Sequence, residues 1–459
     1  MRHKTRRAVH KTGLTAAVAV FTAATAVAQN VNNPASGKLT FATKIDANTN
    51  RSLSTTPAGT TFAISETLGF SLKSETSTQI LSLSGSAGLS IATTGGSGTS
   101  TSTTSPSFTL SYQRNAANAD LNLSASTRSN NVNSSYLADP TMPTSLIVDT
   151  GTRDRTTAAL KANLGKNAPF GVTLSANYDN INYTGTTNPA LFDSNALTLG
   201  ATAQLRLSPV TRASLSITRN DTQLSDVLST TSQGLTYGFG ITHDLASGLT
   251  ISGNLGYLDK RTTASGVTTQ IAGLTAGINA TQPLVRGSIF GGLKYDATGT
   301  TPKTVLNFGR TIDLPNGTLK ASIAADWPQG GSARLLGNAS YSKTLADGSF
   351  SLNLSQSLST NNLSQDIRYS NLSVAYQKNI NSVSGLNLSL GLSRSEDVSG
   401  TGAPTFDRSI FSASYNRTLT QDWGLSVGFL HDQSRRTASA GVVSDSVFLT
   451  VTRGIQFGF

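Results

Sequence analysis

The stretch that decides the fold is GLNLSLGLS, residues 385–393, in which every second residue is a leucine: Leu386, Leu388, Leu390 and Leu392. Asn, Ser and Gly occupy the positions between them. Successive side chains of a strand point to opposite faces, whereas a helix would scatter these leucines around its circumference. The segment is therefore predicted to be a strand with one apolar and one polar face.

The same alternation recurs along most of the chain, for example in residues 197–207, 249–257 and 350–354. The alternating segments run roughly 9 to 13 residues, close to the roughly 9 to 11 that a tilted strand needs to cross a bilayer. Short and long connections alternate, which is typical of membrane barrels. We predict an all-β fold: one large antiparallel transmembrane β-barrel of about 22 strands (range 18–22) with short periplasmic turns and longer outer loops.

The connections divide by their composition. Pro, Gly, Asn and Asp mark six short turns, because these residues set or tolerate turn backbone angles; the turns are 166–169, 208–210, 245–248, 314–317, 346–348 and 420–422. Polar, low-complexity sequence marks the expected long outer loops, which lie near residue 100, at 129–154 and after Phe429.

The N-terminus predicts export. Arg2, Lys4, Arg6, Arg7 and Lys11 precede an apolar stretch, residues 14–28, that is too short to span a bilayer and ends in small residues. We expect a signal peptide at residues 1–28, a short periplasmic segment at 29–37 and the barrel at 38–459; an uncleaved anchor helix is the alternative.

Composition agrees with a membrane barrel. Removing the five cations of the predicted signal peptide from the formal charge of +11 leaves about +6, with Lys and Arg scattered, so no nucleic-acid partner is expected. The chain has no cysteine and hence no disulfide framework. Only 13% of residues are charged and 37% hydrophobic, which suits a barrel with one lipid face and one wet face.

The C-terminus carries the most specific motif, TRGIQFGF at residues 452–459. Thr452, Gly454, Phe457 and Phe459 match, position by position, the terminal β-signal that it resembles in outer-membrane proteins of Gram-negative bacteria. The resemblance implies insertion into the cell outer membrane by the barrel-assembly machinery, among outer-membrane lipid and lipopolysaccharide. Porin-like barrels are the class that the chain is most similar to, and the oligomeric state stays open.

Catalysis is not expected. The mature chain has two histidines, His243 and His431, and the predicted topology puts them at opposite sides of the membrane. We therefore predict no enzyme activity, cofactor or metal site. A 22-stranded barrel also resembles the energy-coupled transporters of the outer membrane, which contain an additional plug domain. Residues 29–37, which lie between the predicted signal peptide and the first strand, are too few for such a domain, so we do not expect a plug.

The face opposite the leucines is rich in Ser, Thr, Asn and Gly, and basic residues predicted to line the lumen share it: Lys161, Arg206, Arg286, Lys294 and Lys320. This pattern predicts passive diffusion of small hydrophilic solutes with a mild preference for anions. Alternatively, carboxylates pair with these cations. Two other functions stay open: a structural or exopolysaccharide-export component of the outer membrane, and a cell-surface adhesin-like β protein.

Two features stand apart from this pattern. The loop at 129–154 is unusually apolar and could fold inward as a constriction carrying Asp139 and Asp149, or stay a surface lid. Glu66 shares the lipid-facing side of its strand with Ile64 and Leu68, where a charge is costly. A bulge or a misread strand is the explanation we expect.

Overall fold

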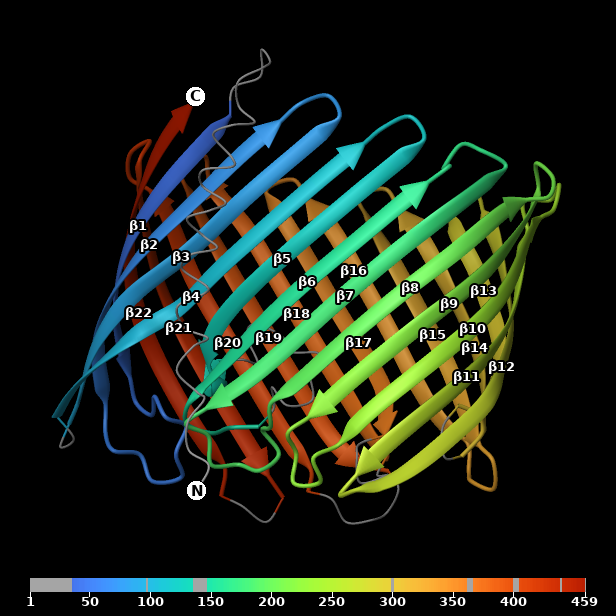
Figure 1. Cartoon of the computed structure of the whole chain (residues 1–459). Coiled ribbons are helices and arrows are strands. Elements are labelled where there is room, and N and C mark those ends of the chain that lie inside the picture. Colours follow the sequence, from blue (N-terminus) through green and yellow to red (C-terminus); the bar gives the residue numbers. More distant parts are fainter. Residues whose placement is uncertain are drawn as a thin grey trace, which may run out of the picture.

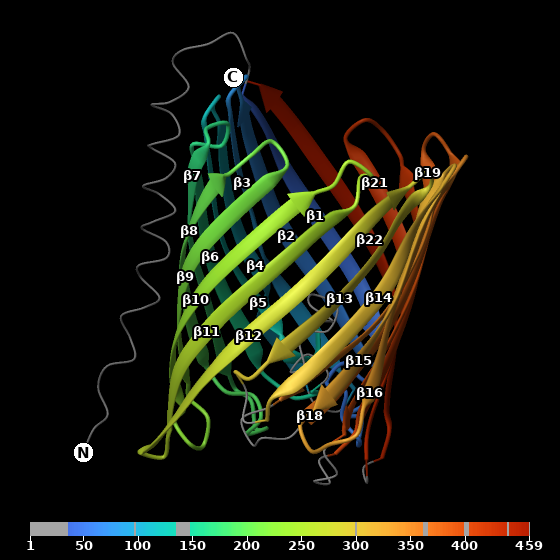
Figure 2. The same cartoon turned by 90° about the vertical axis from the view of Figure 1, so that its right-hand side faces the viewer.

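The computed structural model describes residues 35–95, 98–134, 147–298, 301–360, 366–398, 404–437 and 440–458. They form one closed barrel of 22 antiparallel strands (Figures 1 and 2). The strands are β1 (Ser36–Asn48), β2 (Thr61–Glu75), β3 (Gln79–Thr94), β4 (Gly98–Asn115), β5 (Ala119–Asn131), β6 (Thr152–Leu164), β7 (Phe170–Thr184), β8 (Ser194–Arg206), β9 (Thr211–Leu224), β10 (Thr231–Asp244), β11 (Thr250–Ala264), β12 (Val267–Leu284), β13 (Gly287–Asp296), β14 (Lys303–Leu314), β15 (Gly317–Pro328), β16 (Arg334–Leu345), β17 (Gly348–Thr360), β18 (Asp366–Asn381), β19 (Ser384–Asp397), β20 (Phe406–Thr418), β21 (Trp423–Arg436) and β22 (Val442–Gly458). One 3₁₀ helix, Val132–Ser134, follows β5.

The barrel closes where β1 pairs with β22, from Ser36 opposite Gly458 to Asn48 opposite Ser446. Closure gives the backbone N–H and C=O groups of both terminal strands hydrogen-bond partners, which the hydrocarbon of a membrane could not provide. The start of β1 and the end of β22 therefore lie at the same end, where the short turns also gather (Figure 1). We call this the periplasmic end and the opposite end the outer end, by the usual arrangement of membrane barrels. The predicted all-β barrel is confirmed.

The two faces of the wall differ as the alternation predicts. Large apolar side chains are more than half exposed on the outside, among them Leu215, Leu255, Leu274 and Ile323. The inward positions of β17 are hydroxyls and an amide: Ser349, Ser351, Asn353, Ser355 and Ser357. No helix among the described residues is long and apolar enough to cross a membrane.

Two segments predicted as outer loops are strands instead. β4 begins at Gly98, so most of the Ser/Thr-rich sequence near residue 100 pairs with β3. Hydroxyls fall on both faces there, so no apolar alternation marks the strand, and Thr93 and Thr99 hydrogen-bond across it at 3.2 Å. Likewise, β21 continues through His431 to Arg436. The barrel is thus taller at its outer end than the hydrophobic pattern shows.

Glu66 does lie on the lipid-facing side, exposed between Ile64 and Leu68. The strand assignment was therefore right, and the hydroxyl of Thr43 on β1 donates a 2.8 Å hydrogen bond to the carboxylate. A register shift does occur between β3 and β4, at Ser86 to Gly88, but the pairing of β2 with β3 is regular at Glu66, so no bulge turns its side chain inward.

Candidate functional site

Several inward side chains at the outer end of the barrel are buried, although an empty lumen would leave them exposed to water. Arg408 and Ile410 of β20 are 2% and 3% exposed, and Ser393 of β19 is 5% exposed. Asp432 on β21 and Ser446 on β22 are buried as well. Further along β20, towards the periplasmic end, the inward Ser412 and Ser414 are no longer fully buried. Protein therefore fills the lumen at the outer end along this part of the wall.

Three outer connections lie there, and we call their described residues the outer lid: 49–60 between β1 and β2, 132–134 with 147–151 between β5 and β6, and 185–193 between β7 and β8. Val132, Ile147 and Leu191 form a small apolar core between two of these connections, with Tyr183 packed against it. Val132 is only 1% exposed. The lid therefore has a packed interior of its own.

Asn133 connects the parts of the lid to one another. Its Nδ2 donates to the carbonyl of Ser52 in the first connection (2.9 Å), and its Oδ1 accepts from the N–H of Asp149 (3.0 Å). One side chain thus holds the first connection and both limbs of the second.

Arg408 fastens this centre to the barrel wall. Its Nε and Nη2 bind the two carboxylate oxygens of Asp432 at 3.0 and 2.7 Å, and Nη2 also donates to the carbonyl of Asn133 at 2.5 Å. Strands β21, β22 and β1 to β4 separate β20 from β5, from which the Asn133 segment comes. The contact therefore reaches across the mouth rather than along the wall.

Asp149 joins the third connection to the lid. Its carboxylate accepts hydrogen bonds from the N–H groups of Thr187 and Asn188, both at 2.7 Å, from the Thr187 hydroxyl and from the N–H of Thr150. Partial burial acts to raise the pKa of Asp149, but these donors together lower it below the usual value. The ionised carboxylate is the form that the lid holds.

The predicted constriction at 129–154 falls partly within this lid. Asp149 lies in it, whereas Asp139 lies outside the described residues. Asn133, Arg408 and Asp432 were not predicted, because neither their spacing nor their residue types set them apart in the sequence. Val132 and the buried Ile147 were the available signal, because they belong to the unusually apolar connection at 129–154.

Four of the five predicted lumen residues face inward, and Arg286 does not lie on a strand. It occupies the tight turn between β12 and β13 at the periplasmic end. Lys294 is paired with Asp296 at 2.7 Å, and Lys320 lies 5.3 Å from the ring centre of Phe290. Further inward pairs include Arg155 with Asp179. Carboxylates thus pair with several cations of the lumen wall, as the alternative interpretation of the sequence allowed.

His243 and His431 lie in opposite halves of the barrel, on β10 and β21 and not in loops. His243 Nδ1 is 2.9 Å from the Thr211 hydroxyl near the periplasmic end, and His431 Nδ1 is 2.7 Å from a carboxylate oxygen of Asp445 in the outer half of β21. In the predicted C-terminal signal, Thr452, Gly454 and Phe457 lie on β22, and Phe459 is outside the described residues.

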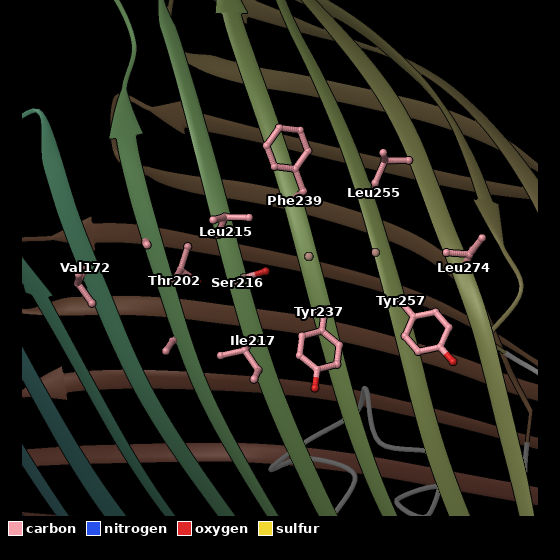
Figure 3. A pocket seen from close by; sticks show the side chains of 14 residues that line it. Val172, Thr202, Leu215, Ser216, Ile217, Tyr237, Phe239, Leu255, Tyr257 and Leu274 are labelled. Atoms are coloured by element: carbon pink, nitrogen blue, oxygen red, sulfur yellow. The ribbon is translucent and has the colours of Figure 1, made fainter.

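The outer surface has a hollow of its own on β7 to β12, with a volume of about 590 Å³ (Figure 3). Tyr237, Phe239 and Tyr257 stand around it. The backbone of Gly238 and Gly256 forms part of its floor, because a side chain at these two positions would point into the lumen. Its lining includes no charged residue. Acyl chains of a bilayer fit such a surface, so we assign no specific ligand to it.

Solved structures share this architecture. The siderophore receptor PirA from Acinetobacter baumannii is 10% identical with a TM-score of 0.55, and the match covers 93% of this chain and 81% of the receptor. The FrpB iron transporter from Neisseria meningitidis (F3-3 variant) is 11% identical with a TM-score of 0.55, and the match covers 93% of this chain and 82% of the transporter. The barrel has the fold of outer-membrane receptors. PirA from Pseudomonas aeruginosa, 11% identical, has a TM-score of 0.51.

These comparisons correct the predicted function. No protein-family model and no curated protein matches the sequence. The structural neighbours are siderophore receptors and an iron transporter, so a passive diffusion porin is wrong, and neither polymer export nor an adhesin fits better. Strand number has a physical meaning here, because barrels of 16 to 18 strands leave an aqueous channel whereas 22-stranded transporters have an obstructed lumen.

Proposed function

We propose that the chain is an outer-membrane uptake receptor: it captures a solute at its outer mouth and admits it to the lumen when the outer lid is displaced. The observation that carries the proposal is the burial of the inward side chains around Arg408 beneath the interlocked loops. A permanently open pore has no use for loops that a buried ion pair fastens over part of its outer mouth. A gated receptor needs them.

The lining of the lumen supports this proposal. Past the lid, the inward positions of β17 and β19 are mostly Ser, Asn and Gly, without charge until Asp397 at the outer end of β19. Such a surface offers hydrogen bonds without holding an ion tightly. The matched receptors and the transporter are named for siderophores and iron, so ferric chelates are the substrate class that we propose.

The proposal is tested by titrating ferric enterobactin and a ferric hydroxamate into the folded protein in detergent. Fluorescence of Trp327 and Trp423, the two tryptophans of the chain, reports global changes, and isothermal calorimetry reports binding. We expect saturable binding of at least one ferric chelate and none of its iron-free form. Failure of both chelates to bind, together with free flux of small sugars through the barrel in liposomes, would contradict the proposal.

A further inference from the structure

A second groove lies on the outer wall of β17 to β21, near the outer end of the barrel. We call it the arginine groove; the outward side chains that line it and carry the argument are Leu354, Leu372, Leu392, Arg394, Asp407 and Arg435. Its volume is about 450 Å³. Arg394 has the same orientation along β19 as Leu392, which is exposed on the outside, so the groove faces the membrane and not the lumen.

The groove is apolar at one edge and charged at the other. Leu354, Leu372 and Leu392 lie side by side on three neighbouring strands, because they are direct partners in the sheet. One step closer to the outer end, the outward residues are Ser370, Arg394 and Asp407, which are again direct partners on β18, β19 and β20. Arg435 on β21 is the direct partner of Asp407. This change from leucine to charge marks the boundary between hydrocarbon and head groups on this wall.

The two arginines differ in how far they are satisfied. Arg394 Nε lies 3.1 Å from Glu396 and 3.9 Å from Asp407, and Glu396 is also bound by Arg368. Arg435 is exposed, and among the residues that the structure describes it makes no hydrogen bond or ion pair. The guanidinium of Arg435 therefore has N–H donors free for a ligand, and it lies about two strand spacings from the guanidinium of Arg394. Both lie next to the exposed leucines, so together they are suited to a lipid with an anionic head group and apolar chains.

We propose that the arginine groove binds a lipopolysaccharide molecule of the outer leaflet, with a phosphate of its lipid A part on Arg435 and Arg394 and an acyl chain against Leu372 and Leu392. The hollow in Figure 3 offers no charged side chain and makes no such distinction between lipids. This site is independent of the proposed uptake function, because it lies on the outside of the barrel wall whereas the outer lid lies on the inside.

The test measures binding of diphosphorylated lipid A to the folded, delipidated protein by native mass spectrometry from detergent. Arg435→Ala is the main variant, since Arg435 has no hydrogen-bond or ion-pair partner to lose among the residues that the structure describes. We expect about tenfold weaker binding, the usual consequence of losing one charge-assisted hydrogen bond to a phosphate. Arg261→Ala is the matched control: Arg261 is an exposed outward arginine near the outer end of β11, away from the groove. Its binding should equal that of the wild type.

Three further measurements complete the test. Dephosphorylated lipid A should bind to the wild type more weakly still than lipid A binds to Arg435→Ala, because it loses the contacts with both arginines. Inorganic phosphate should compete poorly because it has no acyl chain, and phosphatidylglycerol should compete less well than lipid A because its single phosphodiester carries less negative charge than the phosphate monoesters of diphosphorylated lipid A. Asp407→Asn should strengthen binding, because it removes a negative charge next to the phosphate. Unchanged affinity of Arg435→Ala, equal competition by phosphatidylglycerol, or weaker binding by Asp407→Asn would overturn the proposal.

Discussion

Replacing Asn133 by alanine should open the outer lid without disturbing the barrel. The change removes the hydrogen bonds to the Ser52 carbonyl and from the Asp149 N–H, whereas the Asn133 carbonyl that Arg408 binds is retained. Two neutral hydrogen bonds contribute about 2 kcal/mol together. At about 1.4 kcal/mol per tenfold change, the fraction of molecules with an open lid should rise roughly 30-fold.

Thiol labelling measures this opening cleanly, because the chain has no cysteine. Ser434 is buried and is the direct partner of Arg408 in the sheet, so Ser434→Cys should react with a water-soluble thiol reagent only when the lid moves. We expect Asn133→Ala to raise the labelling rate about 30-fold. Asn353→Ala, an exposed inward amide on β17, is the control and should leave the rate unchanged. Equal rates for wild type and Asn133→Ala would refute the role that we assign to Asn133.

Three other predictions concern the latch, the lid and the wall. Arg408→Leu should destabilise the folded protein by about 3 to 5 kcal/mol in urea unfolding, because it leaves Asp432 buried and unpaired; the double change with Asp432→Leu should recover most of this. The labelling rate of Ser434→Cys, divided by that of the fully exposed Val285→Cys to remove the loss of thiolate at low pH, should rise as the pH falls below about 3.8. The ionised Asp149 carboxylate, whose pKa is lowered in the folded lid, stabilises the lid above its unfolded pKa, and this stability is lost as the pH falls towards its folded pKa; Asp149→Asn should abolish this dependence. Glu66→Leu should stabilise the barrel in lipid vesicles by about 1 to 2 kcal/mol, as removal of a lipid-facing carboxylate implies, and a loss of stability would show that the Thr43 hydrogen bond outweighs the cost.

Much of the barrel could be predicted from sequence because alternation acts locally. Leu386 to Leu392 reveal a strand by themselves, since each leucine must face lipid whatever its neighbours are. The strand count and the shared end of both termini follow from summing such segments. The prediction failed at β4, where Ser and Thr occupy both faces and no lipid contact imposes a pattern.

The lid could be predicted only in part. The apolar content of 129–154 indicated that this connection is not an ordinary surface loop, and Ile147 is indeed buried. The contacts that hold it could not be found, because Asn133 and Arg408 are 275 residues apart and meet only when the barrel closes. The porin interpretation failed for the same reason: polar inward residues look alike in sequence whether the mouth above them is open or filled.

The central claim is that this barrel is shut at its outer mouth until the lid moves. Current through single molecules of the wild-type protein in a planar bilayer tests it most directly. We predict a silent baseline in symmetric salt, interrupted by brief openings that become frequent in Asn133→Ala. A steady, ohmic current from every wild-type insertion would contradict the claim.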